Sequence, residues 1–162
     1  MIRIQPKIEN LAPKKLLGIN IEMSLAHNLT GQLWQSFMKR RDEIINRSNT
    51  NYISLQFYEA DYFKYFNPNK NFTKWATVEV TDFDNIPIGM NKLLLSGGLY
   101  AVFNYKGNNA PEIFQYIFTE WLPQSNYNLD DRPHFEILGE RYNNDDPESE
   151  EDIYIPIQMK KG

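Results

Sequence analysis

Alternation of apolar and polar positions predicts most of the strands in this chain. Residues 15–23 alternate well enough to form a strand. Residues 52–58 and 73–80 are rich in β-branched and aromatic side chains and flank a polar turn at 67–71, which predicts a hairpin. Three further strands are predicted at 99–105, 134–138 and 152–157. The segment up to Ala12-Pro13 reads as a lead-in.

Two segments instead repeat their apolar positions every three or four residues, which is the spacing of a helix face. The first begins after a cap at Asn28 or Thr30, and its apolar positions run to Ile45. The second is capped by Asn109, has Pro111 in its first turn and ends at Pro123. Its apolar stripe consists of Ile113, Phe114, Ile117, Phe118 and Trp121.

The order strand, helix, strand, strand therefore occurs twice, over residues of about 13–82 and 92–158, with 82–90 as the link. A unit of this size cannot cover its own apolar faces, so the two copies should pack together. We therefore expect one α+β domain over residues 1–162: a curved antiparallel sheet with the helices on one side. A groove should lie at the pseudo-twofold seam, where ligand sites tend to occur.

Composition excludes several classes of function. The chain has 162 residues, no Cys, two His and a net charge of −4. Without Cys there is no disulfide, thiolate metal site or cysteine nucleophile, and the two histidines lack metal-ligand spacing; we predict neither metal nor cofactor. The acidic balance and the lack of a helix-turn-helix argue against direct DNA binding. No apolar run is long enough for a membrane span or a secretory signal, so we expect a cytoplasmic protein.

Aromatic residues make up 14% of the chain, with ten Tyr and ten Phe. That is more than a core of this size requires when Leu, Ile and Val fill it. Some of these rings should therefore be partly exposed or line a cavity.

Four motifs of the second half carry a resemblance to a known family. They are GGLYAVFNYKG at 97–107, WLPQSNY at 121–127, Phe135-Glu136, and DIYIPI at 152–157. In this order they resemble the gyrase-inhibitor-like small-molecule-binding domain, which is also the effector-binding domain of some AraC-type and MerR-type multidrug regulators. The resemblance implies two strand–helix–strand–strand units around a pocket for lipophilic, often cationic, compounds.

The same resemblance implies an acidic residue at the pocket floor, which here is Glu136. Alternation places Glu136 on the face opposite Phe135 and Ile137, so it points either to solvent or into a second, aromatic-lined space. Asp152 and Tyr154 occupy the positions of the family's acidic and aromatic residues on the last strand, with Asp replacing the commoner, longer Glu. The other candidate ligand-binding residues are Trp75, Tyr58, Tyr100, Phe103 and Trp121.

Some of these candidates have an equally ordinary role in packing. Trp121 lies on the apolar stripe of the second helix, where core packing is expected. By the internal repeat, Trp75 corresponds to Asp152 and could face Glu136 across the seam. His27 and His134 are expected to be surface or structural residues.

Three functions remain open at this stage. The first is binding of small amphipathic, cationic or drug-like molecules, with Glu136 as counter-charge and sequestration, or sensing through a partner protein, as the effect. The second is hydrolysis of strained or xenobiotic molecules, with Glu136 as general base and a tyrosine such as Tyr154 as acid. The third is a protein-interaction module, such as a gyrase modulator, acting through the acidic stretch 145–152.

Overall fold

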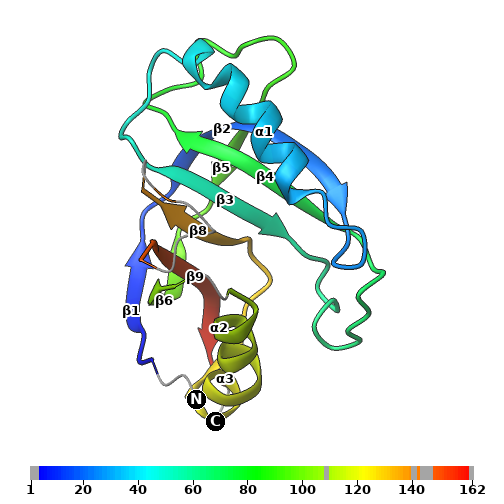
Figure 1. Ribbon diagram of the computed structural model, residues 1–162. Coiled ribbons are helices and arrows are strands. Elements are labelled where there is room, and N and C mark those ends of the chain that lie inside the picture. Colours follow the sequence, from blue (N-terminus) through cyan, green and yellow to red (C-terminus); the bar gives the residue numbers. More distant parts are fainter. Residues whose placement is uncertain (1–3, 108–109, 140–141, 143–147, 161–162) are drawn as a thin grey trace.

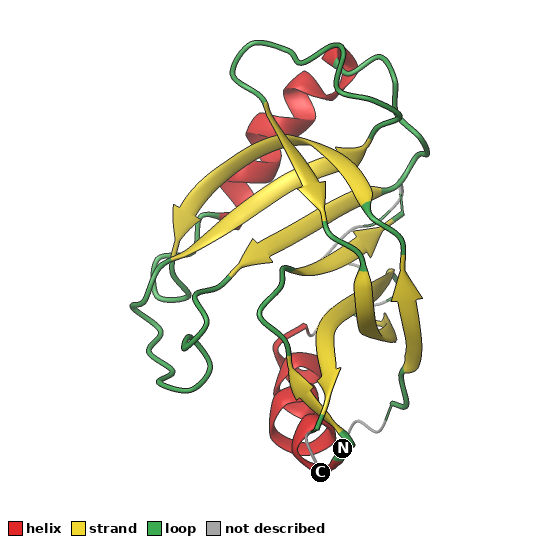
Figure 2. Ribbon diagram, turned by 180° about the vertical axis from the view of Figure 1, so that it is seen from behind, coloured by secondary structure: helices red, strands yellow, loops and turns green. Residues whose placement is uncertain are grey.

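The computed structural model describes residues 4–107, 110–139, 142 and 148–160. The described strands form an antiparallel sheet (Figures 1 and 2). They are β1 (Lys7–Leu11), β2 (Lys14–Met23), β3 (Tyr52–Phe57), β4 (Phe72–Glu79), β5 (Asn91–Leu95), β6 (Gly98–Lys106), β7 (Tyr127–Leu129), β8 (His134–Leu138) and β9 (Glu150–Met159). The helical segments are α1 (Thr30–Arg40), the 3-10 turn η1 (Arg41–Glu43), α2 (Ala110–Tyr116), the π-helical η2 (Ile117–Trp121) and α3 (Leu122–Gln124).

The strand order is β1-β6-β9-β8-β3-β4-β2-β5, with β7 paired to the outer part of β9. This order is symmetric about the β8–β3 pair. Next to β8 lie its hairpin partner β9 and then the earlier strand β6, and next to β3 lie its hairpin partner β4 and then the earlier strand β2. The helices lie on one face of the sheet, α1 over the β2–β4 side and α2 over the β6–β9 side (Figure 1). The predicted fold class, an α+β domain with a curved antiparallel sheet and helices on one side, is confirmed.

Three short strands, β1, β5 and β7, were not predicted, because their sequences show little alternation of apolar and polar residues. β1 lies in the segment that was expected to be a lead-in, and it pairs with β6 from Lys7↔Val102 to Leu11↔Gly98. β5 pairs with β2, and β7 pairs with β9. Strands that bond a neighbour on one side only depend less on a buried face than central strands do. Their sequences therefore lack a clear alternation.

The helix boundaries also differ from prediction. α1 ends at Arg40, and the predicted last apolar position, Ile45, is 74% exposed. The predicted cap at Asn28 or Thr30 is wrong, because Leu29 is the N-cap residue and no side chain makes a capping hydrogen bond there. The backbone N–H of Thr30 donates to Asn28 Oδ1. Pro123 lies inside α3 instead of ending the helix before it, and the predicted cap Asn109 falls outside the described residues.

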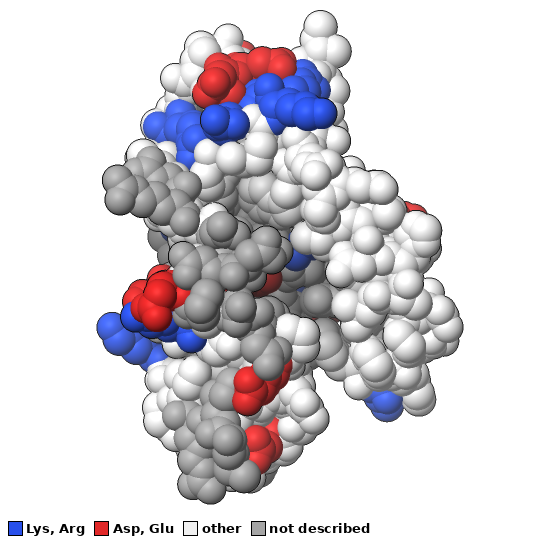
Figure 3. Space-filling view, in the orientation of Figure 1, with Lys and Arg blue, Asp and Glu red and all other residues white. Residues whose placement is uncertain are grey.

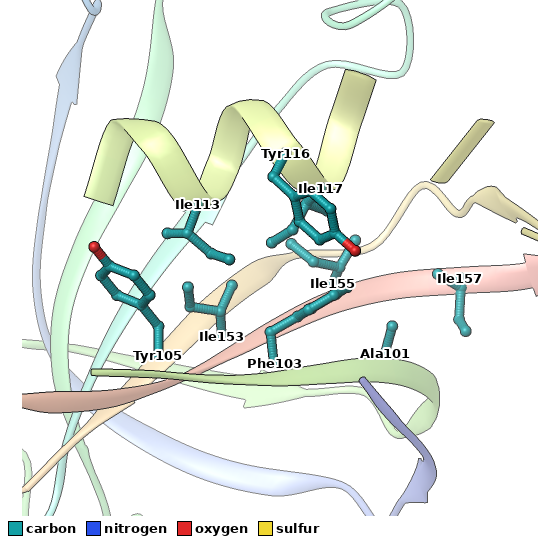
Figure 4. Packing of buried hydrophobic residues seen from close by; sticks show 9 residues of the cluster. All are labelled: Ala101, Phe103, Tyr105, Ile113, Tyr116, Ile117, Ile153, Ile155 and Ile157. Atoms are coloured by element: carbon teal, nitrogen blue, oxygen red, sulfur yellow. The ribbon is translucent and has the colours of Figure 1, made fainter. Parts of the chain in front are cut away.

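Two clusters of buried side chains join the helices to the sheet. Under α2, Phe103 and Ile153 from neighbouring strands meet Ile113 and Ile117 of the helical segment (Figure 4). Under α1, Leu33 and Phe37 pack on Ala76 and Val78 of β4. Burying an aliphatic or aromatic side chain of this size stabilises the fold by about 1.5–3 kcal/mol each.

The opposite face of the sheet curves onto a core of its own. There Trp75, Tyr100 and Phe135 pack with Leu16, Leu55 and Leu95, and Tyr154 lies against them. Phe135 and Tyr154 are stacked with ring centroids 4.4 Å apart. This back core is closed by strand curvature instead of by a helix.

The first and last described residues are both attached to the α2–β7 region. The hydroxyl of Tyr116 donates to the carbonyl of Ile4 over 3.1 Å. The backbone N–H of Lys160 donates to the carbonyl of Asn126 over 3.0 Å. Both chain ends therefore lie at the end of the molecule farther from α1 (Figure 1). In the described part of the chain, none of the helices has the length and apolar character needed to cross a membrane.

Candidate functional site

The centre of the helix-bearing face, between α1 and α2, is hollowed, and acidic and basic atoms are visible at its bottom (Figure 3). Strand pairing defines which residues share this face. Glu136 of β8 lies opposite Ser54 of β3 on one side and Ile153 of β9 on the other. Since Ile153 packs beneath α2, Glu136 is on the helix side of the sheet. We call this region, with Glu136 at its floor, the central hollow.

Three polar side chains from neighbouring strands meet at the floor of the central hollow. Gln56 lies directly opposite Lys74 in the β3–β4 ladder, and its side chain lies between Lys74 and Glu136. With the amide oxygen turned to the Lys74 ammonium, the amide nitrogen donates to Glu136 Oε2 over 3.1 Å and to the His134 carbonyl over 3.2 Å. The three side chains are only 6–8% exposed.

Burial dominates the electrostatics of Glu136. It raises the pKa of this carboxyl to about 7, because the charged form loses its hydration. The Lys74 ammonium and the hydrogen bond from Gln56 act in the opposite direction, whereas the nearby Glu151 raises the pKa further. At neutral pH the carboxyl is therefore divided between its acid and its carboxylate.

Glu151 supplies a second carboxyl on the same face. It lies opposite Tyr105 in the β6–β9 ladder, two positions from Ile153. Burial raises its pKa, while a hydrogen bond from the Tyr142 hydroxyl and the charge of Lys74 act to lower it. Among the described residues, the carboxyls of Glu136 and Glu151 and the ammonium of Lys74 thus lie within electrostatic reach of one another in the hollow.

Aromatic rings line one side of the central hollow. They belong to residues 58–66, the first part of the connection between β3 and β4, which we call the 58–66 segment. Tyr58 packs edge-on against His134, with ring centroids 4.9 Å apart. Phe63 stacks on Phe118 of η2 at 4.7 Å and on His134 at 5.4 Å. These contacts connect the 58–66 segment to the helix of the other half.

His134 is enclosed by these rings. Burial lowers its pKa to about 3, so the imidazole is neutral at physiological pH. This agrees with the structural role predicted for it. Tyr58 is also affected by the site, since burial and the Glu136 charge both raise its pKa well above the ordinary value.

The structure brings only two of the predicted site residues, Glu136 and Tyr58, together at the central hollow. Phe103 shares this face but is fully buried under α2, where it contacts Trp121 edge-on at 5.1 Å. Trp121 also borders a separate open pocket of about 410 Å³, lined further by Gln5, Tyr116 and Glu120. Phe103 therefore takes a packing role, whereas Trp121 both packs on Phe103 and borders this pocket.

The remaining four candidates lie on the opposite face. Tyr154 pairs with Phe135, and Asp152 pairs with Ile137, which places both on the side away from Glu136. Tyr100 and Trp75 belong to the back core, where the Tyr100 hydroxyl donates to the Pro133 carbonyl over 3.1 Å. The expectation that Trp75 faces Glu136 is wrong.

The reason lies in the register of the strands. Leu55 faces Phe135 across the seam, Trp75 pairs with Leu55, and Tyr154 pairs with Phe135. Trp75 and Tyr154 therefore share the face opposite Glu136.

Sequence reasoning missed Lys74, Gln56, Glu151 and Tyr142. A signal for two of them existed, because Gln56 and Lys74 are polar residues in the middle of apolar strands that were already predicted to pair. Among the described residues, no group of three His, Asp or Glu side chains is arranged to hold a metal ion.

Comparison with known proteins agrees with this architecture. Residues 4–158 match the family model of the GyrI-like small molecule binding domain. The transcriptional regulator BrlR of Pseudomonas aeruginosa is 31% identical over 146 residues, which cover 88% of this chain and 51% of BrlR. The chain thus spans about half the length of this curated relative.

Solved structures show the same fold. SAV2435 bound to tetraphenylphosphonium superposes with a TM-score of 0.72 at 16% identity, covering 96% of this chain and 94% of that one. The C-terminal domain of EcmrR gives a TM-score of 0.73 at 12% identity, covering 98% and 100%. Because the family model extends over nearly the whole sequence, this chain belongs to the GyrI-like small-molecule-binding domain family.

Proposed function

We propose that the central hollow binds amphipathic organic molecules that carry a positive charge, and that the chain acts in the cytoplasm by sequestering them or by sensing them through a partner protein. The observation that carries this proposal is the buried Glu136 carboxyl beside the aromatic rings of Tyr58 and Phe63. A carboxylate in such surroundings lacks hydration, and an organic cation compensates its charge while its apolar part contacts the rings.

Two further observations support this ligand class. Glu151 adds a second acidic group, so among the described residues two carboxyls lie near the single ammonium of Lys74. The related fold of SAV2435 was solved with tetraphenylphosphonium, a hydrophobic cation. That molecule is therefore a suitable first probe.

The test is a calorimetric titration of the wild type, Glu136→Gln and Asp152→Asn with tetraphenylphosphonium and with neutral triphenylphosphine oxide. Glu136→Gln should weaken binding of the cation at least tenfold and binding of the neutral compound less than threefold. Asp152→Asn is the matched control, since it removes the same charge from the opposite face, and it should change both affinities less than twofold. Absence of binding by the wild type, or equal affinity of Glu136→Gln for the cation, would overturn the proposal.

A second candidate function is hydrolysis, which is favoured by the raised pKa of Glu136, to about 7, next to Tyr58. Such a carboxyl is suited to accept a proton from water near neutral pH. Tyr154 lies on the other face, so Tyr58, which is close enough to feel the Glu136 charge, would orient the substrate. Incubation with strained cyclopropane-containing compounds should then give product with the wild type and none with Glu136→Gln.

A further inference from the structure

Lys74 is an unusual residue for the centre of a sheet. It occupies the third position of β4 and is 7% exposed. Lysine is almost never buried to this degree without a partner, because its ammonium loses its hydration. Burial accordingly lowers the pKa of Lys74, and the charges of Glu136 and Glu151 counter that effect.

The surroundings of Lys74 show what compensates it. The ammonium donates to the amide oxygen of Gln56, and the amide nitrogen of the same side chain donates to Glu136. Lys74 is therefore connected to the floor carboxylate through one bridging side chain from β3. Glu151 is its second acidic neighbour.

A ligand cation that approaches Glu136 enters the field of this ammonium. Attraction to a carboxylate and repulsion from an ammonium at similar range are of similar size in the same dielectric surroundings. Lys74 thus opposes the interaction on which the proposed function rests. Because Glu151 is a second acidic group near Lys74, one ammonium does not neutralise both carboxylates, and negative charge remains to attract a cationic ligand.

We propose that Lys74 is a built-in counter-ion of the central hollow and determines its charge selectivity, by competing with a ligand's positive group for Glu136. This inference rests on the proposed function of the hollow as a cation site. It predicts that the wild type binds cations more weakly than a variant without the Lys74 charge. The wild type should also discriminate less between cationic and neutral ligands than that variant does.

The experiment compares the wild type, Lys74→Met and Lys92→Met by calorimetric titration at pH 8.0, with tetraphenylphosphonium and with triphenylphosphine oxide. Methionine retains the length of the side chain and removes its charge. Lys74→Met should bind the cation at least fivefold more tightly than the wild type and the neutral compound within twofold. Lys92→Met removes the same charge from an exposed position of β5 and should change neither affinity more than twofold.

Lys74→Gln serves as a second variant in case Lys74→Met does not fold, because it keeps a hydrogen-bond donor toward Gln56. Unchanged or weaker cation binding in the variant that folds would overturn the inference, as would loss of both ligands together. The Glu136→Gln titration tests the proposed function independently of the Lys74 variants. If the wild type and Glu136→Gln bind the cation equally, the proposed function fails; if they differ and the Lys74 variants do not tighten binding, this inference fails.

Discussion

His134 and Glu136 lie two positions apart on β8 and on the same face of the sheet, and burial moves both toward their uncharged forms. It lowers the pKa of His134 to about 3 and raises that of Glu136 to about 7. The two shifts have opposite effects on stability as the pH changes. In the native protein between pH 5 and 7, these effects should largely cancel.

Replacing Glu136 by Gln should reveal the effect of the Glu136 pKa shift on stability. Because the folded protein holds the Glu136 proton up to about pH 7 and the unfolded chain releases it near 4.5, this group makes the wild type lose stability as the pH rises through that window. The loss is about 2 kcal/mol between pH 5 and 7. Urea denaturation should show that Glu136→Gln gains this amount relative to the wild type over the same interval. A parallel pH dependence of the two proteins would contradict the pKa shift.

Replacing His134 by Phe should reveal the effect of the His134 pKa shift on stability. The unfolded chain takes up a proton near pH 6.5, whereas the buried imidazole does not until about pH 3, so the histidine costs stability as the pH falls. Between pH 7 and 5 the wild type should lose about 2 kcal/mol relative to His134→Phe. Phenylalanine keeps a ring for the stack on Phe63. Chemical denaturation at the two pH values measures the difference, and an NMR titration that finds His134 protonating near pH 6.5 would refute the argument.

Phe63 attaches the 58–66 segment to the other half of the molecule through its stacks on Phe118 and His134. Phe63→Ala should therefore lower the free energy of unfolding by about 2 kcal/mol, less than for a fully buried ring because Phe63 is half-buried. Tyr65→Ala, in the same segment but 65% exposed, should change it by less than about 0.5 kcal/mol. Equal effects of the two substitutions would show that the stacks contribute little.

Two glycines give a matched pair for the packing of the sheet. A Cβ at Gly18 of β2 would overlap the backbone oxygen of Ala76 on β4, whereas a Cβ at Gly31 of α1 meets no atom within 4 Å. Gly18→Ala should destabilise the fold by about 3 kcal/mol, since the strands cannot separate without breaking their ladder. Gly31→Ala should stabilise it by about 0.5 kcal/mol through helix propensity. Thermal unfolding of both variants tests this, and a neutral Gly18→Ala would contradict the close approach.

The fold was predictable because the long strands and the apolar stripes of the helices carry clear periods. β3 and β4 were recognised as a hairpin, so the pairing of Gln56 with Lys74 was within reach of the sequence. The sequence does not indicate that this pair is buried, because a lysine in a strand usually points to solvent and the carboxyls beside Lys74 come from the other half of the chain.

The aromatic candidates show the same limit. Trp75, Tyr100 and Tyr154 were selected for their chemistry, but alternation alone does not say which face of a strand will carry the helices. In this protein the face opposite the helices forms the back core, and those three rings pack in it. Glu136 was identified from a motif, whereas its partners come from three other strands, and their meeting depends on the register between the halves.

The attachment of both chain ends to the α2–β7 region has a consequence for the order of the two halves. Ile4 and Lys160 are held by neighbouring parts of one module, through Tyr116 and Asn126. A linker from Lys160 to Ile4 would therefore run along this one module, and Ile88, which is 93% exposed, is a position at which the chain could be opened. Such a circular permutant would place the second half before the first while keeping the sheet order and the seam. The arrangement of the hollow thus depends on which strands pair, and not on which half is synthesised first.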